Sequence, residues 1–149
     1  MSKGQVATEF MVYTSIFMFI AIAAFLIMNQ LQSTEIPLQQ NRVAKEIGEG
    51  FATVFTLSVK GGEGFSYKYN FPRTIFGLPY TINFLSPTYD VIILEWEGSY
   101  GNFSSSYNVP AYPYKFEGCL SDNKLVSNEC SNVLMFENDG ENLTITQVN

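Results

Sequence analysis

The chain has 149 residues and a formal net charge of -6, a length that fits one modest domain with an accessory element. Lys and Arg together number only 8, which leaves no basic stripe for a phosphate backbone, so we expect no nucleic-acid partner. The sequence contains no histidine, and this removes the usual general base and the usual zinc ligand. We therefore expect no enzymatic activity, no metal and no cofactor.

The first feature along the chain is an uncharged apolar run from Phe10 to Met28. At about 1.5 Å per residue it approaches the ~30 Å hydrocarbon core of a bilayer, so it predicts a transmembrane helix. Lys3 is the one basic residue before the run, and the positive-inside tendency predicts a cytoplasmic N-terminus and an extracellular remainder. An uncleaved signal anchor and a secretory signal cut at Ala21-Ile22-Ala23 are the alternatives. The apolar residues 24–28 after that site disfavour secretion.

The residues around the start of the run carry a family resemblance. Lys3-Gly4-Gln5, with Glu9 and Phe10 following, resembles the class III signal peptides of archaeal type IV pilin-like proteins. The resemblance implies that a prepilin peptidase cuts between Gly4 and Gln5, so residues 1–4 are a leader and the apolar helix is kept. It also implies that Glu9 and Phe10 serve assembly, since the corresponding acid in the family is thought to meet the terminal amine of a neighbouring subunit.

The implied partners are the prepilin peptidase, other pilin subunits in a homo- or heteropolymer, the pilus assembly platform, and the membrane before assembly. Ala7 and Thr8 stand where the family often has serine, and the glycine-rich signature of archaellins is missing. A pilin or pilin-like subunit is therefore favoured over an archaellin. The segment 70–82 is similar to the Leu-Pro, Ile-Gly and Tyr-x-Ile pattern of archaeal pilin-like heads, with Phe71 where leucine is more usual.

Helical spacing continues beyond the apolar run. Val43, Ile47, Phe51 and Val54 recur at helical intervals and predict an amphipathic helix over about 36–57. Joined to the transmembrane part, it gives one long helix over 5–60, in which Pro37 can cause a kink or a short break. Three glycines in the stretch 60–64 predict the end of this helix.

After Gly64 the apolar period changes from helical to alternating, which predicts strands. The expected strands are 65–71, 80–84, 89–97, 112–117, 133–137 and 143–148, the last two joined through Asp139-Gly140 as a two-residue hairpin. Residues 65–149 should therefore form an extracellular β-rich head, an antiparallel sheet that rests on the amphipathic half of the helix. The predicted fold class is α+β, with a long membrane-spanning N-terminal helix followed by this small head.

Several head residues are candidate sites. Cys119 and Cys130 are the only cysteines, and in an oxidising extracellular head we expect them to form a disulfide. Asn102 and Asn142 each begin an N-glycosylation acceptor pattern, with Asn102 the better candidate. Glu95 and Glu97 share one strand face, which we interpret as a solvated surface.

The sequence thus favours a structural subunit, major or minor, of an archaeal type IV pilus-like filament. It would be held in the cell membrane as a precursor and then moved to a cell-surface filament, where the head mediates adhesion or surface contact. The alternative is a single-pass, membrane-anchored extracellular binding domain that does not polymerise. An anchored enzyme is a third interpretation, which the missing histidine disfavours.

Overall fold

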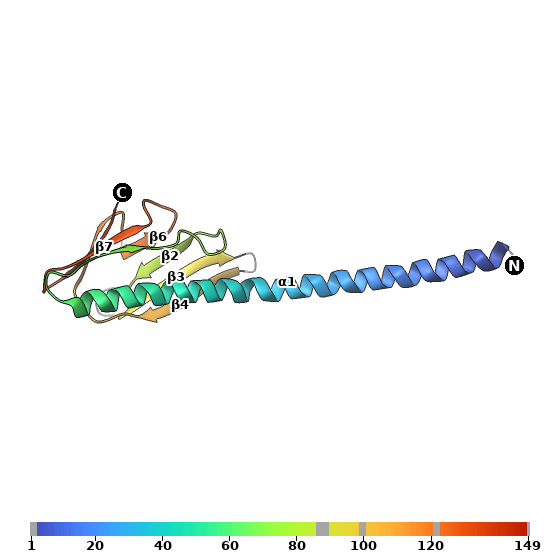
Figure 1. Cartoon of the computed structure of the whole chain (residues 1–149), viewed down its shortest axis with the longest axis horizontal. Coiled ribbons are helices and arrows are strands. Elements are labelled where there is room, and N and C mark those ends of the chain that lie inside the picture. The colour runs from blue at the N-terminus through green and yellow to red at the C-terminus, as the bar shows by residue number, and fades with distance from the viewer. Residues whose placement is uncertain (1–2, 86–89, 99–100, 121–122, 149) are drawn as a thin grey trace. The chain divides into compact units, whose positions relative to one another are not determined.

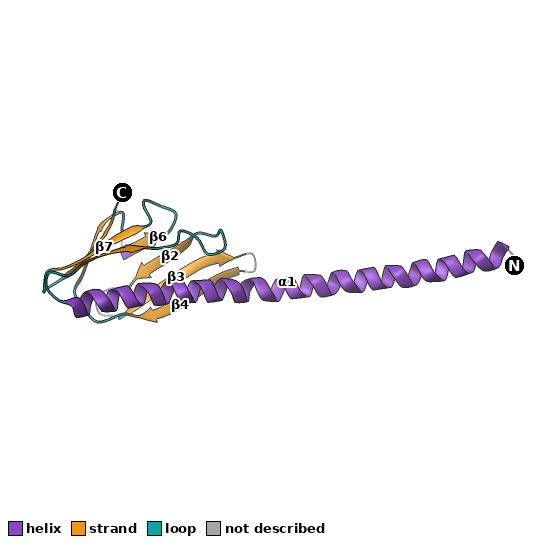
Figure 2. Cartoon of the chain, in the orientation of Figure 1, coloured by secondary structure: helices purple, strands orange, loops and turns teal. Residues whose placement is uncertain are grey.

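The computed structural model describes residues 3–85, 90–98, 101–120 and 123–148. One long helix, α1 (Lys3–Gly61), is followed by a head built of β-strands, which confirms the predicted α+β class (Figures 1 and 2). The described strands are β1 (Ser66–Asn70), β2 (Tyr80–Phe84), β3 (Val91–Gly98), β4 (Gly101–Asn108), β5 (Tyr114–Gly118), β6 (Lys124–Val126), β7 (Val133–Asn138) and β8 (Leu143–Gln147). The chain divides into two compact units, Met1–Leu38 and Gln39–Asn149.

The C-terminal end of α1 agrees with the sequence pattern. It continues through Pro37, so the possible break there does not occur, and it ends at Gly61. Gly62 follows with a positive φ of 70°, a backbone conformation that glycine adopts without a Cβ clash. At the other end, the helix already begins at Lys3 and so includes Gly4 and Gln5.

The head contains two sheets. One has the strand order β1-β7-β8-β5 and the other β4-β3-β2-β6. All strand pairs are antiparallel except β5 and β8, which are parallel. After β5 the chain crosses to the second sheet to form β6 and then returns to the first sheet for β7 and β8. This path allows β8 to run parallel to β5. The single sheet of the sequence-based expectation is thus two sheets with one parallel pair.

The second half of α1 buries one face against both sheets. Ile47, Phe51 and Val54 are buried as their spacing predicts, and the adjacent Phe55 is buried as well. The ring of Phe55 lies 5.7 Å from that of Phe84 and 5.3 Å from that of Phe136, which belong to different sheets. This helix face is therefore the centre of the hydrophobic core.

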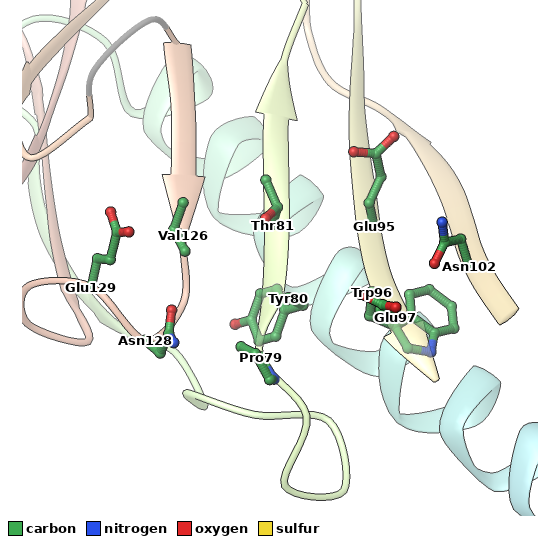
Figure 3. A pocket seen from close by; sticks show the side chains of 10 residues that line it. All are labelled: Pro79, Tyr80, Thr81, Glu95, Trp96, Glu97, Asn102, Val126, Asn128 and Glu129. Atoms are coloured by element: carbon green, nitrogen blue, oxygen red, sulfur yellow. The ribbon is translucent and has the colours of Figure 1, made fainter. Parts of the chain in front are cut away.

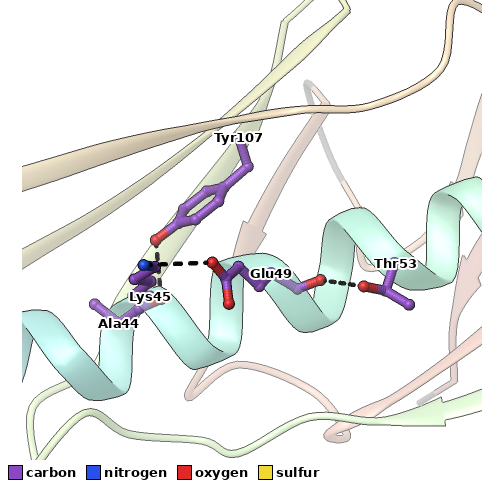
Figure 4. Close-up of polar contacts among 5 residues, drawn as sticks. All are labelled: Ala44, Lys45, Glu49, Thr53 and Tyr107. Atoms are coloured by element: carbon purple, nitrogen blue, oxygen red, sulfur yellow. Dashed lines mark hydrogen bonds and ion pairs between the residues drawn. The ribbon is translucent and has the colours of Figure 1, made fainter.

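Gly48 marks a close approach between α1 and β4. A Cβ at this position would lie 2.0 Å from Cε2 of Tyr107. The Tyr107 hydroxyl donates a hydrogen bond of 3.2 Å to the carbonyl oxygen of Ala44, and Lys45 and Glu49 form an exposed ion pair nearby (Figure 4). A glycine that weakens the isolated helix thus makes room for an aromatic ring of the sheet.

Other details differ from the predicted strands. β4 and β6 were not predicted, and Tyr89, the predicted start of the third strand, lies outside the described residues. The β7–β8 connection exists, but Asn138 pairs with Leu143, so residues 139–142 form a longer loop than the expected two-residue turn. In this loop Asp139 accepts hydrogen bonds from the N–H groups of Asn142 and Glu141, which lower its carboxyl pKa.

Candidate functional site

The main candidate surface is the N-terminal part of α1. Every side chain from Ala7 to Leu31 is exposed, and Phe10, for example, exposes 71% of its surface. The exposed large apolar residues of this stretch are Phe10, Met11, Val12, Tyr13, Ile16, Phe17, Met18, Phe19, Ile20, Ile22, Phe25, Leu26, Ile27, Met28 and Leu31. Monomeric soluble proteins rarely expose apolar patches larger than a few hundred Å². This surface therefore requires an apolar cover, such as lipid or another protein surface, that shields it from water.

Two polar side chains inside the apolar run, Thr14 and Ser15, are compatible with an apolar environment. The Thr14 hydroxyl donates a hydrogen bond of 2.8 Å to the carbonyl oxygen of Phe10, and the Ser15 hydroxyl donates one of the same length to Met11. Because both donors are satisfied within the helix, no polar partner is needed outside it. By length and composition, α1 could cross a membrane.

Glu9 stands at the start of the apolar run. Its side chain is exposed and lines a shallow hollow of about 410 Å³ with Thr8, Val12 and Tyr13. Within the part of the chain that the structure describes, Glu9 has no ion-pair partner. The predicted cleavage residues Gly4 and Gln5 lie in the first turn of α1, and their side chains are outside the described part. The carboxylate of Glu9 therefore lies on the exposed surface of the helix.

The disulfide prediction is confirmed. Cys119 and Cys130 are joined with an S–S distance of 1.99 Å. The closed segment contains β6, which pairs with β2 of the second sheet, while the strands on either side of it, β5 and β7, belong to the first. The disulfide therefore fixes the base of the excursion that links the two sheets.

The two glycosylation candidates differ in their surroundings. Asn102 lies near the start of β4, at the edge of its sheet, and its side chain is exposed. Asn142 is half-buried in the β7–β8 loop, where its N–H group donates a 2.6 Å hydrogen bond to Oδ1 of Asp139. Exposure and position thus favour Asn102 as an acceptor.

Glu95 and Glu97 lie on the exposed face of β3 and line a hollow of about 580 Å³ (Figure 3). The Asn83 side chain donates a 2.7 Å hydrogen bond to Oε2 of Glu95, while Trp96 between the two acids is buried. In the described residues, no group of three or more His, Cys, Asp and Glu side chains is placed to hold a metal ion. This face has the features of a solvated polar surface.

One exposed residue that the sequence patterns did not single out is Phe76. It lies in the connection between β1 and β2, with a positive φ of 51° and 58% of its surface exposed. The sequence signal was the Phe76-Gly77 pair between two apolar residues, a short-turn pattern. What the pattern could not give was the sign of φ at Phe76.

No family model, curated protein or solved structure matches the chain. The surface that most needs a partner to shield it from water is the exposed apolar stretch of α1, and Glu9 lies at the end of that stretch.

Proposed function

We propose that the chain is a structural subunit of a type IV pilus-like surface filament. The observation that carries this proposal is the apolar surface of α1 from Phe10 to Leu31, which is exposed on all sides of the helix. A helix that is apolar all round belongs in lipid or in the middle of a helix bundle. In a pilin-like assembly process the helix meets both environments in turn. Lipid surrounds it in the stored precursor, and neighbouring helices surround it in the assembled subunit.

The internal hydrogen bonds of Thr14 and Ser15 support this exchange of covers. Neither hydroxyl has to find a new partner when lipid is replaced by another helix, because each stays bonded to a carbonyl of its own helix. Transfer from lipid to bundle then depends mainly on side-chain packing, and small residues such as Ala21, Ala23 and Ala24 favour close approach of helices.

Glu9 gives the helix a specific polar contact. Cleavage between Gly4 and Gln5 would create a cationic amine on Gln5, four residues before Glu9 and about 6 Å away along a helix axis. An ionised acid in an apolar bundle costs on the order of 2–3 kcal/mol unless a partner relieves it. The amine of a neighbouring subunit is such a partner, and the pair would set the axial offset between copies.

The head would then face outward from a filament core made of α1 helices. Its two sheets pack on the buried face of α1, and the Cys119–Cys130 disulfide suits an oxidising extracellular environment. In this position the head surfaces are free for adhesion or other contacts. The same chain can serve as a major subunit along the filament or as a minor one at particular places.

The N-terminus of the mature protein, sequenced from cell membranes or filaments, tests the proposal. A start at Gln5 is the expected result, because only removal of residues 1–4 produces the amine that pairs with Glu9. A start at Met1 or Ser2 would contradict the proposal and indicate a membrane-anchored binding domain that does not polymerise. A start at Ala24 would also contradict it and indicate a secreted protein.

A further inference from the structure

The edge strands of the head differ in how they are protected. The free N–H and C=O groups of an edge can pair with another chain, and proteins prevent this with short strands, lysine, proline or bulges. Among the described strands, the edges are β1 and β5 in one sheet and β4 and β6 in the other. β1, β5 and β6 are five, five and three residues long, and each carries an exposed lysine. These lysines are Lys68, Lys115 and Lys124.

β4 lacks these protections. It has eight residues, none of them charged and none a proline. It pairs with β3 residue by residue along its full length, so it contains no bulge. A hollow of about 500 Å³ lies beside it, lined by residues 104–107 of β4 and by Asn41 and Lys45 of α1. This edge is therefore long, uncharged and accessible to a further strand.

The sequence of β4 reads almost the same in both directions. After its first glycine it is Asn-Phe-Ser-Ser-Ser-Tyr-Asn, centred on Ser105. When two copies of this strand pair antiparallel about Ser105, Asn102 faces Asn108 of the second copy. Phe103 likewise faces Tyr107, and the serines face one another. Because aromatic pairs and hydroxyl pairs stabilise antiparallel strands, and a two-fold interface must be self-complementary, the pattern fits a second copy of β4.

The aromatic rings of β4 are already held in place within the head. The ring of Phe103 stacks on that of Trp96, with 5.5 Å between the ring centroids. The Tyr107 hydroxyl donates its hydrogen bond to the carbonyl oxygen of Ala44. Pairing therefore costs little further ordering of these side chains. The exposed side chain of Asn102 leaves the backbone edge free, because side chains of a strand stand roughly perpendicular to the sheet.

We infer that the edge of β4 is a docking surface for β4 of a second copy, and that the two strands pair antiparallel with Ser105 facing Ser105. The pair joins the sheets of two heads into one continuous sheet. It is isologous, so it closes with two copies. The inference goes beyond the proposed filament, since two heads can pair without polymerisation. It gives the proposed adhesive role of the head a partner, another copy of the same chain.

Sedimentation velocity of the full-length chain in detergent micelles tests the pairing. Detergent covers the apolar stretch of α1, and the chain is produced without glycosylation because Ser104 belongs to the acceptor pattern of Asn102. Ser104→Lys combined with Ser106→Lys places like charges opposite one another in the pair. Both serines are exposed, so the fold should be kept. We expect a wild-type dimer and a dissociation constant at least several-fold higher for the double variant.

Ser66→Lys is the matched control for the double variant. Ser66 is an exposed serine on β1, an edge strand that already carries Lys68. This variant should form the dimer as the wild type does, and the midpoint of thermal unfolding should be the same for all three chains. A wild-type chain that stays monomeric would overturn the inference. A dimer that the two lysines on β4 leave unchanged would overturn it as well.

Introduced cysteines test the register without adding charge. The two cysteines of the chain are joined to each other, which leaves introduced thiols as the reactive ones. Since Ser104 faces Ser106 of the second copy, full-length Ser104→Cys mixed with Ser106→Cys should give a disulfide-linked dimer under mild oxidation. Ser104→Cys alone is the control, because its two thiols lie on a diagonal of about 7–8 Å. Mixed links no more frequent than control links would reject pairing about Ser105 and overturn the inference.

Discussion

Glu9 is the residue on which the assembly proposal depends most. Glu9→Gln removes the charge that would pair with the amine of Gln5 but keeps the size of the side chain. We predict that the variant is still cut after Gly4 and loses most of its incorporation into filaments, since an ion pair in an apolar bundle cannot be replaced by a neutral amide. Intact mass of the membrane fraction measures cutting, and filament yield measures incorporation.

Glu46→Gln is the control for this variant. Glu46 is an exposed acid on the same helix, within the unit that contains the head. Its substitution should leave both cutting and filament yield unchanged. Normal filament yield from Glu9→Gln would show that the acid has no role in assembly.

Gly48 allows a close approach between helix and sheet. Gly48→Ala places a methyl group against the ring of Tyr107, where the Cβ would lie 2.0 Å from Cε2. Although alanine favours a helix, we predict a loss of about 1–3 kcal/mol in the free energy of unfolding, because the core is overpacked. Denaturant unfolding measures the change.

A double-mutant cycle with Tyr107→Leu identifies the cause of this loss. If the clash with the ring is responsible, Gly48→Ala should cost much less in the Tyr107→Leu background. Equal cost in both backgrounds would reject the explanation from close packing.

Asn102 is the glycosylation site that the structure favours. In protein taken from its native cells, we predict a glycan on the peptide containing Asn102 and none on the peptide containing Asn142, because only Asn102 has an exposed side chain. Mass spectrometry of the peptides gives the result. A glycan on Asn142 with none on Asn102 would contradict the ranking by exposure.

At the scale of elements, the disulfide holds the excursion that forms β6. Replacing Cys119 and Cys130 with serine should lower the free energy of unfolding by about 3 kcal/mol, since the unfolded chain is no longer constrained. The loss should be felt first at β6, so hydrogen exchange of the Ser127 amide, which donates to Tyr80 at 2.9 Å, should speed up.

The amide of Asn138 is the internal reference for that experiment. It donates to the carbonyl oxygen of Phe65 at 2.9 Å, beside the first sheet, away from the closed segment. Exchange at Asn138 should change only as far as global stability changes. Equal acceleration at Ser127 and Asn138 would show that the disulfide has no local effect on β6.

The elements that the sequence predicted are those with a strong apolar period. The spacing of Ile47, Phe51 and Val54 predicted the buried face of α1, and alternation predicted β2 and β8 almost to their ends. β4 was missed because Ser104–Ser106 hides the alternation of Phe103 and Tyr107. Pairing with β3 along its full length, a tertiary effect, overrides the weak strand propensity of these polar residues.

Other features had no readable signal in the sequence. β6 has three residues, too few for a period, and the parallel pairing of β5 with β8 depends on the path of the chain through the other sheet. The disulfide could be predicted because the chain has only two cysteines. For the apolar surface of α1, composition was enough, whereas the Phe76-Gly77 pair indicated a turn but neither the positive φ nor the exposure of Phe76.

In the molecule as a whole, the two units differ in whether they bury their own apolar surface. The head has a core of its own, whereas the apolar part of α1 has no cover within the chain from Ala7 to Leu31. A membrane anchor would satisfy the helix with lipid alone. The proposed filament also explains why an acid stands at the edge of the apolar run.

The contact proposed for Glu9 joins unlike surfaces of two copies. Such heterologous contacts generate open helical assemblies unless the rotation between copies closes a ring. The proposed contact also fixes the axial position of one copy against the next through the amine of Gln5.

Electron microscopy with an antibody against the head shows whether the chain polymerises. The antibody is applied to whole cells and to filaments sheared from them, with cells that lack the chain as the control. We expect filaments labelled either along their length or at particular places, and we expect the chain in the sheared fraction. Labelling confined to the cell membrane, with none of the chain in sheared filaments, would contradict it.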